Sequence, residues 1–205
     1  MAESPPLREP RMVHTAPVHP VNPAHQVTAA PPLFPLEGGC DCHLVRYRLQ
    51  TPPLFVHCCH CRWCQRESGA AFALNAMIES DRVTSLAQAP ALVDTPSASG
   101  LGQQIARCPT CHVAVWSHYA GAGPLVSFVR VGTLDEPDRL PPDIHIFTAT
   151  KQPWVLLPPG VPAVPEYYER EAHWPAASLA RRQMLLPRIE AWQAARRAGR
   201  GETDG

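Results

Sequence analysis

The chain has few charged residues, no net charge and no long apolar run. Each of these absences excludes a class of partner or location. Charged residues make up 18% of its 205 residues, and 18 basic side chains balance 18 acidic ones. A neutral chain has no bulk electrostatic attraction for a polyanion, so we expect no nucleic-acid partner. No apolar stretch reaches the roughly 18 residues that a transmembrane helix needs, so we expect no membrane association.

The N-terminal residues lack the features of a secretory signal peptide. MAESPPLREPRMVHTAP contains no apolar core of the kind that such signals require. We therefore expect a cytoplasmic protein. In a reducing compartment, clustered cysteines are more often metal ligands than disulfides.

Proline and cysteine are what the sequence does contain in quantity, with 25 and 8 residues respectively. The prolines favour short strands and extended segments over long helices. We expect a disordered arm rich in proline and histidine over residues 1–35 and a β domain over 36–170. A C-terminal helical extension and tail should follow over 171–205, because the composition becomes helical there.

Short apolar or alternating runs predict many strands in the β domain. Runs at such close spacing are typical of an all-β sandwich or a barrel-like pair of sheets. In the extension, two helices are expected over 176–186 and 188–198, broken at Pro187. The expected strands fall within residues 43–49, 52–58, 70–78, 81–86, 90–95, 103–108, 112–119, 123–134, 144–150 and 153–158.

Two short cysteine motifs that lie far apart in the sequence supply one set of four thiolates. Cys40 and Cys42 form a CxC motif, and Cys108 and Cys111 form a CxxC motif. Tetrahedral zinc takes four such ligands, and a closed set of this kind is structural. Burial as small apolar side chains is the alternative, but paired cysteines in a reducing compartment favour a metal.

The stretch VHCCHCRWC holds the other four cysteines. Side chains alternate along a strand, so Cys59 and Cys61 share a face, and the next turn can bring Cys64 back towards them. Cys58 then points the opposite way, and we expect its loss to affect packing and not metal binding. Three ligands with a fourth position open are typical of catalytic zinc.

The charge of this three-cysteine set favours one class of substrate. Three thiolates on Zn²⁺ give a net charge of −1, which weakens activation of water but leaves a soft site that accepts another thiolate. Arg62 and Arg66 are candidates to offset that charge or to hold a carboxylate. Two alternatives remain open: closure of the site by His60 or Cys58, and a metal-free thiol redox site.

Taken in order, the blocks GGCDC, CHCRWCQRESG, CPTC, VGTLDEP and PDIHIFTATKQPW resemble the glutathione-dependent formaldehyde-activating (GFA) family, which is related to centromere protein V. The resemblance implies a β-tent fold, with antiparallel sheets pinned by zinc. It implies two zincs per chain. The structural ligands would be Cys40, Cys42, Cys108 and Cys111, and the catalytic ligands Cys59, Cys61 and Cys64.

The implied activity is that of a carbon–sulfur lyase, which joins a small thiol such as glutathione to formaldehyde or a related small aldehyde, or runs the reverse reaction. A zinc-stabilised binding module without catalysis is the alternative.

The sequence departs from the family pattern at four places. His43 and His112 stand where the family usually has glycine after each cysteine motif, and Cys58 lies outside the pattern. The loop 95–104 lacks the usual tyrosine and paired serines.

Three further residues are candidates near a site. His145 is a possible proton carrier, and Lys151 and Trp154 are possible pocket or sheet-edge residues. Asp135 is expected to set a turn.

Overall fold

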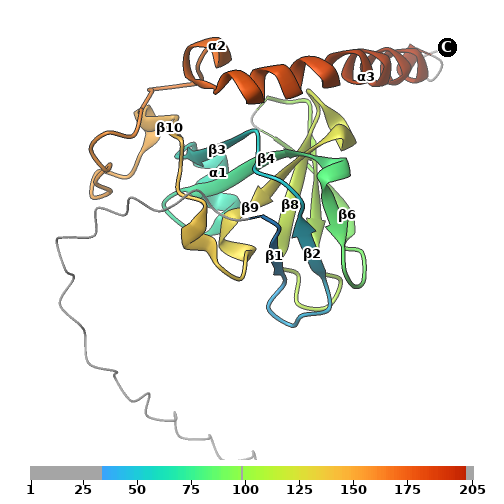
Figure 1. Cartoon of the computed structure of the whole chain (residues 1–205), viewed down its shortest axis with the longest axis horizontal. Helices are drawn as coiled ribbons and strands as arrows, with labels where there is room; N and C mark the ends of the chain where they lie inside the picture. Colours follow the sequence, from blue (N-terminus) through green and yellow to red (C-terminus); the bar gives the residue numbers. More distant parts are fainter. Residues whose placement is uncertain (1–33, 98, 202–205) are drawn as a thin grey trace, which may run out of the picture. The chain divides into compact units, whose positions relative to one another are not determined.

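The structure is a computed structural model that describes residues 34–97 and 99–201. The N-terminal arm predicted over 1–35 therefore falls almost entirely outside the described residues. Within the described part, ten strands form two sheets (Figure 1), which confirms the predicted mainly-β fold.

The larger sheet has seven strands, and its order brings distant segments of the chain together. The order is β10-β3-β4-β9-β8-β7-β6, antiparallel except for the β10–β3 pair, which is parallel. The strands are β3 (Phe55–Cys59), β4 (Ala73–Glu79), β6 (Ala91–Thr95), β7 (Gln103–Arg107), β8 (Ala114–Tyr119), β9 (Val126–Arg130) and β10 (Ile144–Ile146).

The smaller sheet has three antiparallel strands, β1 (Leu36–Gly39), β2 (Arg46–Leu49) and β5 (Val83–Ser85), in the order β1-β2-β5. It packs on one face of the larger sheet. Tyr47 and Leu49 from the small sheet share a buried cluster with Val56, Ala76 and Val129 from the large one.

The other face of the larger sheet is covered by the C-terminal segment. Phe55 and Met77 alternate with Val56 and Ala76 along their strands, and they pack against Trp174 and Leu185 instead. Residues one position apart in a strand point to opposite faces, so each strand contributes to both cores. The covering elements are α2 (Arg170–His173) and α3 (Ala176–Gly201).

The C-terminal helix corrects one prediction. We expected a break at Pro187, but α3 runs through it as one helix. Pro187 is exposed, while Leu185 and Ile189 on either side of it are buried in the same cluster. Burial on both sides offsets the roughly 3 kcal/mol that an internal proline costs.

Polar contacts also attach α3 to the sheet. Arg181 forms an ion pair with Glu79 at the end of β4, and Arg188 pairs with Asp81 at 2.8 Å. The division into a domain over 36–170 and an extension over 171–205 remains our proposal.

Three local predictions differ from the structure. Residues 153–158 form no strand, so Trp154, which is 71% exposed, is not a sheet-edge residue. A short helix, α1 (Arg62–Ser68), stands where only a turn was expected.

The described part of the chain contains no helix that is long and apolar enough to cross a membrane.

Candidate functional site

Two hairpin-like knuckles bring together the four-cysteine cluster of Cys40, Cys42, Cys108 and Cys111. The four sulfurs lie within 4.8 Å of one another. Cys42 Sγ is 3.5 Å from Cys40 Sγ and 3.6 Å from Cys108 Sγ. Sulfurs around tetrahedral zinc are about 3.8 Å apart, since each Zn–S bond is about 2.3 Å. The cluster therefore fits a zinc ion with four thiolate ligands.

Backbone geometry explains how each knuckle turns its cysteines inward. The N–H of Val45 donates to Cys40 Sγ at 3.3 Å, and the N–H of Thr110 donates to Cys108 Sγ at 3.4 Å. His43 and His112 follow the last cysteine of each knuckle with φ of 60° and 61°. These are the two places where the family has glycine, and the structure needs the left-handed conformation there.

The three-cysteine cluster of Cys59, Cys61 and Cys64 lies where β3 meets α1. Cys59 ends the strand, Cys61 is the N-cap of the helix, and Cys64 lies in its first turn. The Cys64 N–H donates to Cys61 Sγ at 3.4 Å. All three sulfurs lie within 4.8 Å of one another, so the structure brings together the three residues that the sequence singled out.

The electrostatics of this cluster favour a thiolate at the helix N-terminus. Hydrogen bonds from Cys59 and Cys64, together with the backbone N–H groups of Cys64 and Trp63, lower the pKa of Cys61. The same contacts raise the pKa of Cys59 and of Cys64, because a neighbouring thiolate disfavours a second negative charge. A cation among the three sulfurs reverses that preference and suits all three as thiolates.

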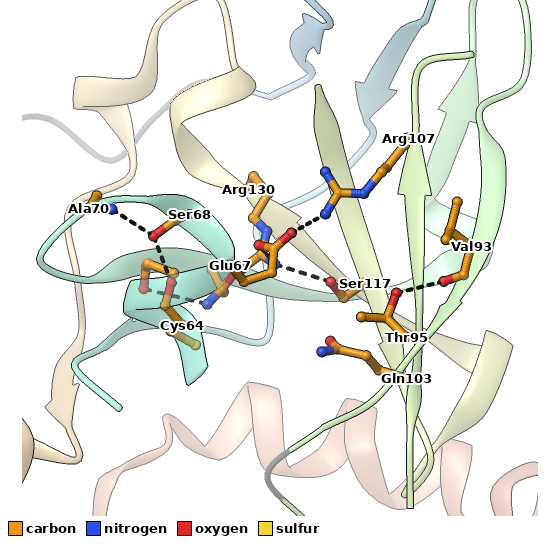
Figure 2. Close-up of polar contacts among 12 residues, drawn as sticks. Cys64, Glu67, Ser68, Ala70, Val93, Thr95, Gln103, Arg107, Ser117 and Arg130 are labelled. Carbon is orange, nitrogen blue, oxygen red and sulfur yellow. Dashed lines mark hydrogen bonds and ion pairs between the residues drawn. The ribbon is translucent and has the colours of Figure 1, made fainter. Parts of the chain in front are cut away.

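Helix α1 is held against the large sheet by a nearly buried carboxylate. The Glu67 side chain is 8% exposed and forms ion pairs with Arg107 of β7 and Arg130 of β9 (Figure 2). Arg130 also donates to Asn75 Oδ1 at 2.6 Å. These contacts fix the position of the helix that carries Cys61 and Cys64.

A pocket of about 330 Å³ opens beside the three-cysteine cluster. Its wall is largely aromatic, and no Lys, Arg, Asp or Glu from the described residues lines it. Besides the three cysteines, the lining residues include His57, Trp63, Asn75, Ser97, Ser99, Tyr119, Phe128, Ile146, Phe147 and Tyr167.

Burial shifts the pKa values of two polar side chains on the pocket wall, His57 and Tyr119. Burial lowers the pKa of His57 to about 4, so its ring is neutral at physiological pH. Its Nε2 lies 2.5 Å from the Tyr168 hydroxyl. Burial raises the pKa of Tyr119, and the nearby Cys64 sulfur adds to that shift. The Tyr119 hydroxyl therefore stays protonated and can donate to a ligand.

The other candidate residues lie away from this pocket. Arg62 and Arg66 line a different hollow with Gln152 and Trp154. The Lys151 ammonium donates to the backbone oxygens of Gln152 and Val155. Asp135 accepts two hydrogen bonds from Arg46 and so links its loop to β2.

Cys58 faces away from the three-cysteine cluster, as predicted from strand alternation. Its sulfur lies instead with the rings of His60 and His145, and these three donors form a group of their own. His60 and Cys58 were the alternative fourth ligands of the three-cysteine cluster. Both group with His145 instead.

Sequence reasoning missed the aromatic wall, above all Trp63, Tyr119 and Tyr167. Trp63 lies within the cysteine motif and was available as a signal. Tyr119 and Tyr167 are far from the motif in sequence, and only the fold brings them to it.

Comparison with known proteins now decides the family. A family model described as "Glutathione-dependent formaldehyde-activating enzyme" matches residues 35–150, which is more than half of the 205-residue chain. The chain belongs to the GFA family.

Solved and curated proteins add little to the GFA assignment. A crystal structure of a Rhodobacter sphaeroides protein from a structural genomics effort matches with 19% identity and a TM-score of 0.38, covering 49% of this chain and 88% of that one. Among curated proteins, none matches this chain.

Proposed function

We propose that this GFA protein is a zinc-dependent carbon–sulfur lyase that adds a small thiol to formaldehyde or a related small aldehyde, and catalyses the reverse. The observation that carries the proposal is the three-cysteine cluster on the wall of a pocket. Cys59, Cys61 and Cys64 supply three ligands, and Cys58 and His60, the two candidates for a fourth, group with His145 instead. A set of three protein ligands leaves one position for a substrate.

Zinc bound by these cysteines would favour the thiolate form of a substrate thiol and hold its sulfur in place. The four-cysteine cluster would hold a second, structural zinc. The chain's own residues do the remaining work. The aromatic wall excludes water and confines the aldehyde close to the substrate sulfur, which favours the encounter of the two reactants.

The Tyr119 hydroxyl is the candidate proton donor. When the thiolate sulfur bonds to the carbonyl carbon, the carbonyl π bond breaks and its oxygen needs one proton. Tyr119 lines the pocket and stays protonated because burial raises its pKa. Its hydroxyl can supply that proton and regain one from solvent. The reverse reaction returns the proton to Tyr119 and releases aldehyde and thiol.

The pocket also bears on the choice of thiol. Its volume of about 330 Å³ lies at the small end of ligand pockets, and its described lining carries no formal charge to pair with carboxylates. Glutathione has two carboxylates and an ammonium group, so its peptide ends would have to lie outside the pocket. A compact neutral thiol fits inside it, and both classes belong in the test.

The direct test is exchange spectroscopy by NMR on a mixture of thiol, formaldehyde and their adduct. Exchange above the uncatalysed rate is expected for the zinc-loaded protein with glutathione or with a neutral thiol such as 2-mercaptoethanol. Tyr119→Phe should lower the catalysed part roughly 10²-fold while zinc content is unchanged, since one donor to a developing oxyanion contributes about that much. Cys61→Ser should abolish it.

Zinc X-ray absorption separates catalysis from the binding-module alternative. An added thiol should raise the number of sulfur neighbours at zinc in the wild type, but not in Cys61→Ser. No enhancement of exchange and no change in the zinc shell at millimolar thiol would contradict the lyase assignment and favour a zinc-stabilised binding module.

A further inference from the structure

A third group of side chains that could hold a metal ion lies buried behind the three-cysteine cluster. Cys58, His60 and His145, here called the Cys–His cluster, are 2%, 0% and 5% exposed. Cys58 Sγ is 3.6 Å from His60 Nε2, which is 3.0 Å from His145 Nδ1. All three donor atoms lie within 4.8 Å of one another.

The cluster is distinct from the proposed catalytic site because of strand geometry. Cys58 and Cys59 are neighbours on β3 and therefore point to opposite faces of the sheet. Cys59 lines the pocket, whereas none of the three Cys–His residues does. The two groups share a strand but open to different sides of it.

The distances match those of a metal site. Around tetrahedral zinc, a thiolate sulfur and an imidazole nitrogen lie about 3.6 Å apart, and two imidazole nitrogens about 3.3 Å apart, given the usual bond lengths. The observed 3.6 Å and 3.0 Å are close to these values. One thiolate with two imidazoles is also a donor set that zinc and neighbouring transition metals accept.

Backbone hydrogen bonds hold all three residues in place before any ion binds. Cys58 and His145 are direct partners in the parallel β3–β10 pair. The N–H of His60 donates to Ile146 O at 3.0 Å, and the His60 carbonyl accepts from Gln65 and Thr150. A cluster that is preorganised loses little conformational entropy when it binds an ion.

We propose that Cys58, His60 and His145 form a third metal site, which holds zinc and ties β10 to β3. The β3–β10 ladder is only three residue pairs long, so an additional cross-link there matters. Ile146 and the following Phe147 line the pocket, and the third ion therefore positions one wall of it. Binding of Zn²⁺ displaces the Cys58 thiol proton to solvent and leaves a net charge of +1.

That residual charge in a buried setting makes this site weaker than the four-cysteine cluster. This difference in zinc affinity should set the order in which a chelator removes the ions. The Cys–His site should release its ion before the four-cysteine cluster does.

The test uses the fact that the other two clusters contain only sulfur ligands. Imidazole scattering in the zinc X-ray absorption spectrum of the zinc-saturated, full-length protein can come only from a site with histidine. We expect about three zincs per chain by elemental analysis and a clear imidazole contribution. Two zincs per chain with no imidazole scattering in the wild type would overturn the proposal, and this measurement needs no variant.

Single-residue variants then show whether the imidazole scattering comes from the Cys–His cluster. His145→Gln should lose one zinc equivalent and the imidazole scattering. His118→Gln is the matched control, because His118 is also buried, lies outside all three clusters and has its Nδ1 3.0 Å from the Val126 carbonyl oxygen. If His145→Gln does not fold, Cys58→Ala removes one ligand with little change in volume and should give the same loss. Retention of the imidazole signal in a folded variant would contradict the assignment.

The inference does not depend on the proposed lyase activity. Cys61→Ser should remove thiol exchange and leave the imidazole signal intact. Loss of the imidazole signal in His145→Gln with exchange retained would still support the site. Each proposal can therefore fail without the other.

Discussion

The four-cysteine and three-cysteine clusters use the same donor atoms but join very different lengths of chain. Cys42 and Cys108 are 66 positions apart, and their contact joins the turn between β1 and β2 to the turn between β7 and β8. Cys59, Cys61 and Cys64 lie within six consecutive positions at one strand–helix junction. Closing a long loop removes more entropy from the unfolded chain than closing a short one.

The two clusters also differ in what surrounds them. The four-cysteine cluster is complete in itself and is built from two knuckles. The three-cysteine cluster opens onto a pocket of about 330 Å³ and depends on a helix held by Glu67. We therefore expect the four-cysteine cluster, which links distant segments, to stabilise the fold, and the local three-cysteine cluster to offer a binding position.

The largest expected effect is from Cys108→Ser. Removing this ligand should release one zinc and lower the free energy of unfolding by at least about 4–5 kcal/mol, because both the metal and the long-range link are lost. Thermal melting by circular dichroism and elemental analysis measure the two effects. A variant that loses the zinc but melts within a few degrees of the wild type would contradict the structural role of the four-cysteine cluster.

The next effect concerns the support of α1. Glu67→Gln should cost about 1–3 kcal/mol, because Arg107 and Arg130 lose a charged, nearly buried partner. Glu136→Gln is the control, since Glu136 pairs with Arg139 but is 63% exposed, and it should cost less than about 1 kcal/mol. Urea denaturation compares the two. Equal costs would show that the Glu67 contacts do not hold the helix.

Cys61→Ser should have a smaller effect on stability but a complete effect on exchange. Serine is a good N-cap, so α1 keeps its first hydrogen bond while the cluster loses a thiolate. We expect a loss of about 1 kcal/mol, one zinc fewer and no catalysed thiol exchange. Global unfolding of this variant would mean that the local cluster is structural too.

The smallest effect is expected from the two knuckle histidines. His43→Gly and His112→Gly relieve a left-handed conformation that costs a non-glycine residue about 1–2 kcal/mol, but glycine adds about 0.5–1 kcal/mol of unfolded-state entropy. Each change should therefore stabilise the fold by about 0.5 kcal/mol. Gly69→Ala should destabilise the fold, because Gly69 has a φ of +66° and the added methyl group would meet no atom within 4 Å to compensate the strain.

Much of the fold follows from local sequence, with failures that have physical causes. Alternating apolar runs were sufficient to predict nearly all strands of the large sheet. Helix α1 was missed because it has only seven residues and its N-cap is Cys61, a residue type that is not a usual N-cap. The break at Pro187 was wrong because packing of Leu185 and Ile189 outweighs a local penalty.

The sequence by itself determined the three-cysteine cluster, since cysteine spacing and strand alternation are local properties. It indicated the four-cysteine cluster through the number of ligands that tetrahedral zinc takes, which one CxC motif and one CxxC motif together supply. It also indicated that Cys58 points away from Cys59. Only the tertiary structure decided what Cys58 meets there. The parallel pairing of β10 with β3 places His145 opposite Cys58, although the two are far apart in the chain. The same folding brings Tyr119 and Tyr167 to the pocket, because contacts between distant segments depend on how sheets and helices pack and not on any local pattern.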